Sequence, residues 1–194
     1  ILTEKLQASA FSAAQQLTDL TDERMKTIFE ISDAISISPV IRSLRRYTLP
    51  FTASKYYNIH QIGYTLESYI VHKPLILQIY IHCPQLKCLV NFDHIYTKEN
   101  QYDSIIEKNL HLSEETFHAL TAAQHQYDLY VTDDGERLLL FKTISTSLED
   151  NSPTLTLVMV LNHSTFASML EDTAQTFQAQ LEIQLPADCF LGAP

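Results

Sequence analysis

The chain of 194 residues contains only three glycines, Gly63, Gly135 and Gly192. A phosphate-binding loop and a nucleophile elbow each need glycines placed close together, so this sequence can build neither. The close His and Cys pairs of common zinc sites are also missing, because no His-Glu-x-x-His or Cys-x-x-Cys pattern occurs. We therefore expect that the chain is not an enzyme, and that it holds no cofactor and no metal.

Long apolar stretches are missing too. No run approaches the roughly 20 residues that a membrane-spanning helix requires, and the first residues do not form a signal peptide. The sequence begins with Ile1 rather than Met. We expect a fragment or a processed form of a longer protein.

Basic residues are scarce, with 13 Lys and Arg against 23 Asp and Glu and a formal net charge of -10. Such an acidic surface repels phosphate backbones and anionic lipids, so we expect no nucleic acid to bind this chain. The single basic cluster is Arg42, Arg45 and Arg46, which is either a solvated helix face or an anion site. The composition, with 45% hydrophobic and 19% charged residues, is that of a globular domain.

The first 37 residues predict one long helix, because apolar residues recur at steps of three and four and no Gly or Pro precedes Pro39. Such a helix would span about 50 Å, more than one small domain can bury along its length. It can lie along its own domain, or its exposed end can pair with a second copy to form a homodimer. The apolar stripe consists of Leu6, Ala10, Ala13, Leu17, Leu20, Ile28, Ile31 and Ile35.

The remaining sequence alternates between helical and strand patterns. Expected helices cover 40–47, 54–72 with Ser54 as the cap, 100–109, 113–125 and 164–178. Expected strands run from Leu75 to the turn at Pro84, and over 88–92, 127–132, 137–145, 154–161 and 181–185. This order describes an α+β domain, in which helices gather on the faces of an antiparallel sheet.

Two of the three cysteines, Cys83 and Cys88, flank a four-residue turn between two expected strands. Cysteines in such positions can face each other across a hairpin. They can form a disulfide, which would stabilise the fold by roughly 2 kcal/mol, or remain as two buried thiols. The choice depends on the redox compartment.

The strand after Leu75 has two different faces. Leu77, Ile79 and Ile81 form an aliphatic face that we expect to lie against the long helix. The opposite face can contribute hydrogen-bonding groups to a small-molecule pocket, or can simply face solvent on an open sheet. The candidate ligand-binding residues are Gln78, Tyr80 and His82 on this strand, with Tyr130, Arg137 and Lys142 from later strands.

The order of elements resembles that of the Cache sensor domains. The resemblance rests on the long first helix, the segment Ser38-Pro39-Val40-Ile41-Arg42, a Tyr-rich helix, the strand Ile79-Tyr80-Ile81, and the strand and helix over 155–170. It is most similar to the domains of membrane-bound AraC-type transcription regulators and histidine kinases of Firmicutes. The turn after the last strand departs from that family, because Pro186-Ala187-Asp188-Cys189 replaces Asp-x-x-Gly.

The resemblance implies a PAS-like fold, a location outside the cytoplasm, attachment to the membrane in the full-length protein, a small-molecule ligand and dimerisation through the long helix. On this basis residues 1–37 form the long helix and 38–178 the membrane-distal module. Residues 179–194 form either a final strand or the start of a second, truncated module. The family's pattern of Tyr, Arg and Asp for binding amino acids does not map onto this sequence, so no particular ligand is implied.

Three functions are compatible with these patterns. The first is a sensor whose ligand shifts the packing of the sheet against the long helix and so signals across the membrane. The second is a ligand-free dimerisation or interaction module. The third, a small enzyme, has no catalytic pattern to support it.

Overall fold

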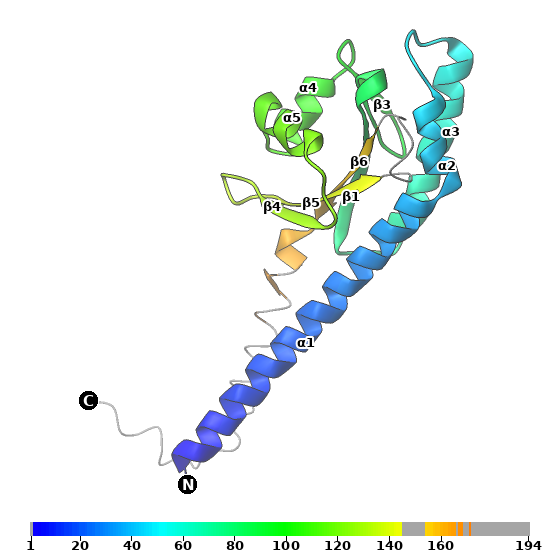
Figure 1. The fold of residues 1–194 in the computed structure, drawn as a ribbon. Helices are drawn as coiled ribbons and strands as arrows, with labels where there is room; N and C mark the ends of the chain where they lie inside the picture. Colours follow the sequence, from blue (N-terminus) through cyan, green and yellow to red (C-terminus); the bar gives the residue numbers. More distant parts are fainter. Residues whose placement is uncertain (1, 145–153, 166, 169–170, 172–194) are drawn as a thin grey trace. The chain divides into compact units, whose positions relative to one another are not determined.

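The computed structural model describes the backbone of residues 2–144, 154–165, 167–168 and 171, and the side chains of most of these from Thr18 onward. The fold is α+β, as predicted, with helices on a six-stranded antiparallel sheet (Figure 1). The strand predicted at 181–185 and most of the helix predicted at 164–178 lie outside the described residues; positions 163–165, 167–168 and 171 are helical.

The predicted long helix is present as α1 (Leu2–Ile37). Pro39 then begins the short helix α2 (Pro39–Arg42), where its missing N–H is not needed. The 3₁₀ turn η1 (Ser43–Arg46) follows. The next helix, α3 (Ala53–Ile70), is capped by Thr52, whose side chain accepts from the amide of Lys55. The cap therefore lies two residues before the predicted Ser54.

The sheet has the order β3-β2-β1-β6-β5-β4, with every neighbouring pair antiparallel. One hairpin joins β1 (Ile76–Cys83) to β2 (Cys88–Val90) through the 3₁₀ turn η2 (Pro84–Leu86). A second joins β4 (Asp128–Val131) to β5 (Leu138–Ile144). The central strand β6 (Leu155–Leu161) is buried along its whole length. The edge strand β3 (Ile95–Thr97) was not predicted, because three residues are too few to show a pattern.

Helix α3 packs on β1, β2 and β3 and covers this half of one face of the sheet. The core on this side is aliphatic and includes Ile59, Leu66, Ile79 and Ile81, each at most 1% exposed. Gly63 permits this packing, because a Cβ at its position would fall far inside van der Waals contact of the carbonyl oxygen of Asn91. This glycine, which looks like a weak point in the helical sequence, is the point where α3 comes closest to the sheet.

The aliphatic face of β1 differs from its prediction at Leu77. This residue is the extra residue of a β-bulge, since Ile76 pairs with Leu161 and Gln78 with Val160, and it is 43% exposed. Helix α3 packs on this face, and the end of α1 lies on the same side of the sheet, because Lys142 is in one cross-strand row with Ile81 and is bound by Asp33. The prediction for Leu77 failed because a strict alternation leaves no room for a bulge.

The opposite face of the sheet is covered by α4 (Tyr102–Lys108) and α5 (Glu114–Ala122) (Figure 1). Ser113 caps α5 by accepting from the amide of Thr116, at 3.0 Å. The core here is more aromatic, with Tyr80, Tyr102, Phe117 and Phe141 among its members. The face carrying Tyr80 is therefore a second core and not an open sheet surface.

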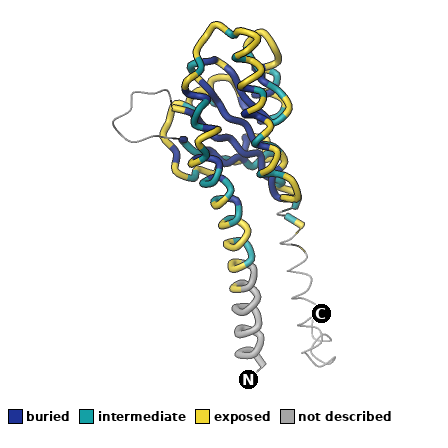
Figure 2. The backbone as a smooth tube through the Cα atoms, turned by 90° about the vertical axis from the view of Figure 1, so that its right-hand side faces the viewer, coloured by how far each residue is buried: buried dark blue, intermediate teal, exposed yellow. Residues whose placement is uncertain are grey.

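The chain divides into two compact units, residues 28–163 and a second unit of residues 1–27 with 164–194. The first unit contains the entire sheet and α2 to α5. Its central strands β1, β2, β5 and β6 are mostly buried, and buried residues fill the middle of the tube in Figure 2. The predicted division of the chain at residues 37 and 178 stays a prediction.

Candidate functional site

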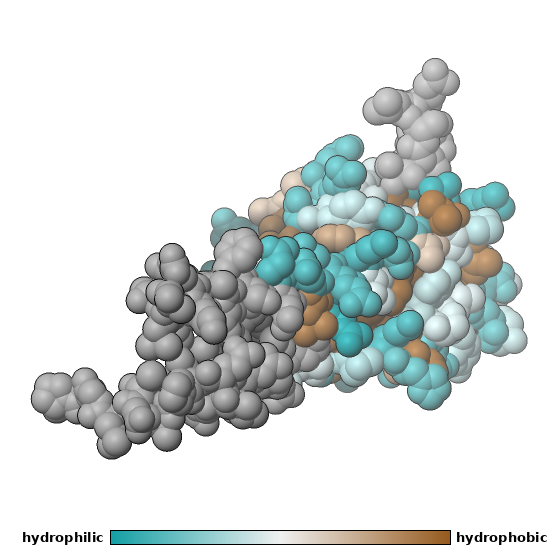
Figure 3. Space-filling model, turned by 90° about the horizontal axis from the view of Figure 1, so that it is seen from below, coloured by the Kyte–Doolittle hydropathy of each residue, from teal (hydrophilic) through white to brown (hydrophobic). Residues whose placement is uncertain are grey.

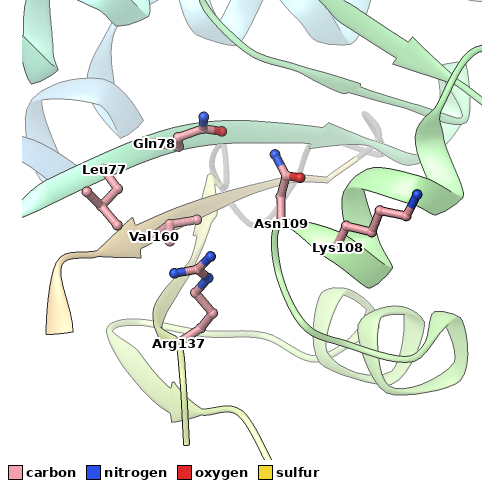
Figure 4. A pocket seen from close by; sticks show the side chains of 6 residues that line it. All are labelled: Leu77, Gln78, Lys108, Asn109, Arg137 and Val160. Atoms are coloured by element: carbon pink, nitrogen blue, oxygen red, sulfur yellow. The ribbon is translucent and has the colours of Figure 1, made fainter. Parts of the chain in front are cut away.

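A pocket of about 360 Å³ opens at one end of the α4–α5 face, near the start of β1. That volume lies within the range of small-molecule sites. Two strands and the end of α4 contribute its walls (Figure 4). The lining residues are Leu77, Gln78, Lys108, Asn109, Arg137 and Val160.

Local backbone features place these side chains. The bulge at Leu77 lets two consecutive residues, Leu77 and Gln78, both border the pocket. Asn109 is the residue that ends α4, and its amide donates to the carbonyl of Ile105 at 3.0 Å. The amide of Arg137 donates to the hydroxyl of Thr132 at 3.0 Å, which fixes the hairpin just before β5.

A chain of hydrogen bonds holds the pocket amides in place. The Tyr80 hydroxyl accepts from Asn109 Nδ2 at 3.2 Å and donates to Gln78 Oε1. Asn91 also donates to Gln78 Oε1, at 3.5 Å. Burial of Tyr80 raises its pKa to about 12, so its hydroxyl stays protonated and keeps donating. Because the oxygen of Gln78 is occupied, its NH₂ group is the part left for a ligand.

The pocket is rich in donors. Arg137 extends its guanidinium toward Gln78 and Val160 (Figure 4). Its Nε is buried and has no hydrogen-bond partner in the described part of the chain. Lys108 borders the pocket through its stem while its ammonium points away (Figure 4). A guanidinium and a free amide NH₂ over the apolar Leu77 and Val160 form an environment that suits a small anion such as a carboxylate.

The structure brings together some of the six predicted ligand-binding residues. Gln78 and Arg137 line the pocket and Tyr80 supports it from behind. Tyr130 packs against the aromatic core and donates to Asp133 at 3.4 Å. His82 lies farther along β1, in a second pocket.

Lys142 does not join the pocket. It alternates with Phe141 and so lies on the other face of β5, where its ammonium is bound by Asp33 of α1 and lies 4.2 Å from the ring centre of Tyr127. A lysine in the middle of an apolar strand is costly unless its ammonium has a partner, and here the carboxylate of Asp33, 109 residues earlier, is that partner. Lys142 and Tyr127, which also donates to Asp33 at 2.5 Å, lower the pKa of Asp33.

Four pocket residues were not predicted. Lys108 and Asn109 end a helix, Val160 lies in a fully buried strand, and Leu77 was assigned to the opposite face. A polar residue at the last position of the predicted helix 100–109 was the available signal for Asn109. No sequence pattern marked the other three.

The predicted hairpin sets Cys83 opposite Cys88 in the sheet register, and both are buried free thiols. The disulfide alternative is therefore not the state in this structure. The hydrogen bond with Cys88 and burial raise the pKa of Cys83, so it is a thiol and not a reactive thiolate.

The basic cluster is not one anion site. Arg42 donates through Nε to the carbonyl of Ser36 at 2.7 Å, and Arg45 is 8% exposed and donates to the carbonyl of Ile144. Arg46 is exposed. Arg42 and Arg45 thus fix this helical segment through hydrogen bonds to backbone carbonyls.

His111, Asp134 and Glu136 place three potential metal-ligating atoms within 4.8 Å of one another. A hydrogen bond already explains this group, because His111 Nδ1 lies 2.6 Å from Asp134 Oδ2 and joins the α4–α5 loop to the β4–β5 hairpin. Hydrogen bonds from Thr132, Glu136 and His111 lower the pKa of Asp134.

Comparison with known proteins gives no identification: no family model matches the chain, and no curated protein matches it. Among the helices of the described residues, none combines the length and apolar character needed to cross a bilayer.

Proposed function

We propose that this chain is the small-molecule-sensing domain of a membrane-bound signal-transduction protein, located outside the cytoplasm, and that its ligand carries an anionic group. The observation that carries the proposal is the pocket in which the guanidinium of Arg137 and the NH₂ group of Gln78 lie over apolar side chains. The family resemblance supports the location, the membrane attachment and a homodimer formed through α1.

The ligand class follows from the polar groups of the pocket. Arg137 supplies a planar set of donors, which matches the two oxygens of a carboxylate. Tyr80 and Asn91 occupy the acceptor oxygen of Gln78, so this amide also presents donors. A cationic ligand would meet the charge of Arg137 without an acidic residue among the lining side chains.

Strand β5 provides a route from the pocket to α1. Arg137, directly before β5, borders the pocket, and Lys142 on the same strand is held by Asp33 of α1. A ligand that draws Arg137 into a new position would shift β5 and with it the anchor of α1. Such a ligand signals only if it binds the two positions with different affinity.

Isothermal titration with a panel of small mono- and dicarboxylates and free amino acids tests the binding step. We expect at least one compound to bind at a 1:1 ratio. Arg137→Gln should weaken that compound at least tenfold, and Lys108→Gln should weaken it less, because the Lys108 ammonium points away from the pocket.

Arg46→Gln and Lys87→Gln are matched controls, since each removes one exposed cation outside the pocket. Equal weakening by these controls would indicate general charge attraction and contradict the assigned site. No binding by any compound in the panel, with an unchanged unfolding temperature, would favour the ligand-free dimerisation module instead.

A further inference from the structure

The β4–β5 hairpin meets the loop between α4 and α5 beside the pocket of Arg137. His111 lies in this loop, and Asp134 and Glu136 lie in the hairpin. Asn109 precedes His111 by two positions and Arg137 directly follows Glu136, and both of these neighbours border the pocket (Figure 4). One imidazole and two carboxylates therefore connect the two segments, and the proposed function makes no use of them.

The ligand atoms of these three side chains lie close together as they stand. His111 Nδ1 is 2.6 Å from Asp134 Oδ2 and 3.5 Å from Glu136 Oε2, and each residue offers a ligand atom within 4.8 Å of the other two. Metal bonds of about 2.0–2.2 Å place two atoms on one ion roughly 3.0–4.4 Å apart. An ion that replaces the hydrogen-bond proton therefore needs the His111–Asp134 pair to separate by about half an ångström, and the other distances change by less.

The hydrogen bond between His111 and Asp134 does not account for the position of Glu136. A hydrogen on Nδ1 serves one acceptor, and Asp134 is that acceptor at 2.6 Å. Glu136 then faces a second carboxylate, and in the described part of the chain no lysine or arginine forms an ion pair with either one. A doubly protonated His111 would balance one of the two negative charges, whereas a divalent cation balances both.

Asp134 is already oriented as a ligand. Its Oδ1 accepts from the hydroxyl of Thr132 at 2.6 Å and from the amide of Glu136 at 3.0 Å, so Oδ2 is the oxygen that faces His111. Such supporting hydrogen bonds fix the carboxylate that binds a metal. The same bonds and His111 lower the pKa of Asp134, which keeps it ionised, as a metal ligand must be.

The geometry points to a site for a divalent transition-metal ion such as Zn²⁺, bound by His111 through Nδ1 and by Asp134 and Glu136 through one carboxylate oxygen each. The imidazole nitrogen favours Zn²⁺ and Ni²⁺ over Mg²⁺ and Ca²⁺. The side chains of Asp134 and Glu136 are 45% and 66% exposed, so water can complete the coordination. The ion fastens the loop after α4 to the hairpin before β5. The sequence gives no sign of this set, because His111 lies 23 residues before Asp134.

Isothermal titration of the metal-free protein with Zn²⁺ and Ni²⁺, in the absence of any carboxylate compound, tests the site. Mg²⁺ is the comparison ion. We expect one transition-metal ion per chain and no measurable binding of Mg²⁺ at the same concentrations. Binding of Mg²⁺ as tight as that of Zn²⁺ would show a general attraction of cations to the acidic hairpin and would overturn the inference.

Three variants each remove one ligand. His111→Asn should weaken Zn²⁺ binding at least tenfold, and asparagine suits the φ of 55° at this position. Asp134→Asn should also weaken it at least tenfold, while its amide oxygen can still accept from Thr132 and from the amide of Glu136. Glu136→Gln should weaken it at least threefold, the smallest effect of the three because this side chain is the most exposed.

Asp133→Asn is the matched control. Asp133 is exposed, precedes Asp134 in the same hairpin and is not one of the three ligand residues. The variant removes the same charge as Asp134→Asn, and the affinity for Zn²⁺ should stay within twofold of wild type. Equal weakening by the two variants would attribute the binding to net charge and contradict the site.

Ring ¹⁵N NMR identifies the nitrogen that binds the metal. Comparison of wild type with His111→Asn assigns the His111 ring, and Zn²⁺ should move its Nδ1 signal to the range of a metal-bound imidazole. Stoichiometric binding that leaves this signal in place would overturn the inference, and so would the absence of stoichiometric Zn²⁺ or Ni²⁺ binding. Neither result bears on carboxylate binding at Arg137, so the two proposals fail independently.

Discussion

The two faces of the sheet are covered by helices in different ways. Under α3 the core is aliphatic and closed, and a glycine lets the helix come close to the strands. Under α4 and α5 the core is aromatic, contains a hydrogen-bonded tyrosine and a histidine, His82, whose Nδ1 has no partner among the described residues, and has a pocket at each end. Helices α4 and α5 have only 7 and 9 residues, whereas the other face is covered by the 18-residue α3 over β1, β2 and β3 and by the end of α1 at β5.

The two faces therefore have different roles, one in stability and the other in binding. The α3 face contributes dry packing, and the α4–α5 face carries the polar groups that a ligand needs at the two places its helices leave open. On the visible side in Figure 3, the described surface is largely hydrophilic with small separate apolar patches. Three predictions test the comparison, in order of decreasing effect.

The largest effect concerns pH and His82. Its pKa falls from 6.5 to about 4 on folding, so the unfolded chain binds this proton more readily between those values. Stability is therefore complete above pH 6.5 and decreases as the pH falls toward 4, by roughly 3 kcal/mol for this group. We expect His82→Phe to remove this part of the pH dependence, measured by urea unfolding from pH 7 to 4.5. An unchanged slope would mean that His82 is not buried, and the contrast between the faces would fail.

The next effect tests the closed face. Gly63→Ala places a methyl group against the carbonyl of Asn91, where backbone would have to move, and we expect a loss of about 1–3 kcal/mol in the free energy of unfolding. Helix propensity alone would give the opposite sign, a gain of about 1 kcal/mol. Urea unfolding distinguishes the two, with the exposed α3 residue Ser68 changed to Ala as the control. A stabilised Gly63→Ala protein would show that α3 does not lie so close to the sheet.

The smallest effect concerns the link between α1 and β5. Asp33 is half exposed, so we expect its coupling to Lys142 to be at most about 1 kcal/mol at pH 7, from a double-mutant cycle of Asp33→Asn and Lys142→Met. Because the pKa of Asp33 is lowered on folding, this stabilisation is present at neutral pH and is lost as the pH falls below 3.8 through the folded-state pKa. A coupling that does not depend on pH would show that the contact is not ionic.

Sequence patterns were sufficient for most of the local structure. The spacing of apolar residues predicted α1, α3, α4 and α5, and the strands expected over 127–132 and 137–145 correspond to β4 and β5. They were also sufficient for the pairing of Cys83 with Cys88 across the turn. Gln78 was predicted because it lies on the hydrogen-bonding face of its strand, and Arg137 because a later strand could bring it to the same space.

The site could be predicted only in part, because its form depends on contacts between distant segments. The bulge at Leu77 arises from the register with β6, more than 80 residues later. Lys142 was predicted to bind a ligand, but in the structure its ammonium binds the carboxylate of Asp33. His82 looked like a polar group at a pocket mouth, but α5 buries it against Phe117.

Periodicity and capping are local, so the amino-acid sequence by itself determined the helices, the hairpins and the α+β class of this protein. The tertiary structure decided which helix covers which face, which polar side chains find partners and where the sheet stays uncovered. The physical reason is that burial and pairing are properties of surfaces brought together from distant parts of the chain, and a linear pattern contains no distance between them.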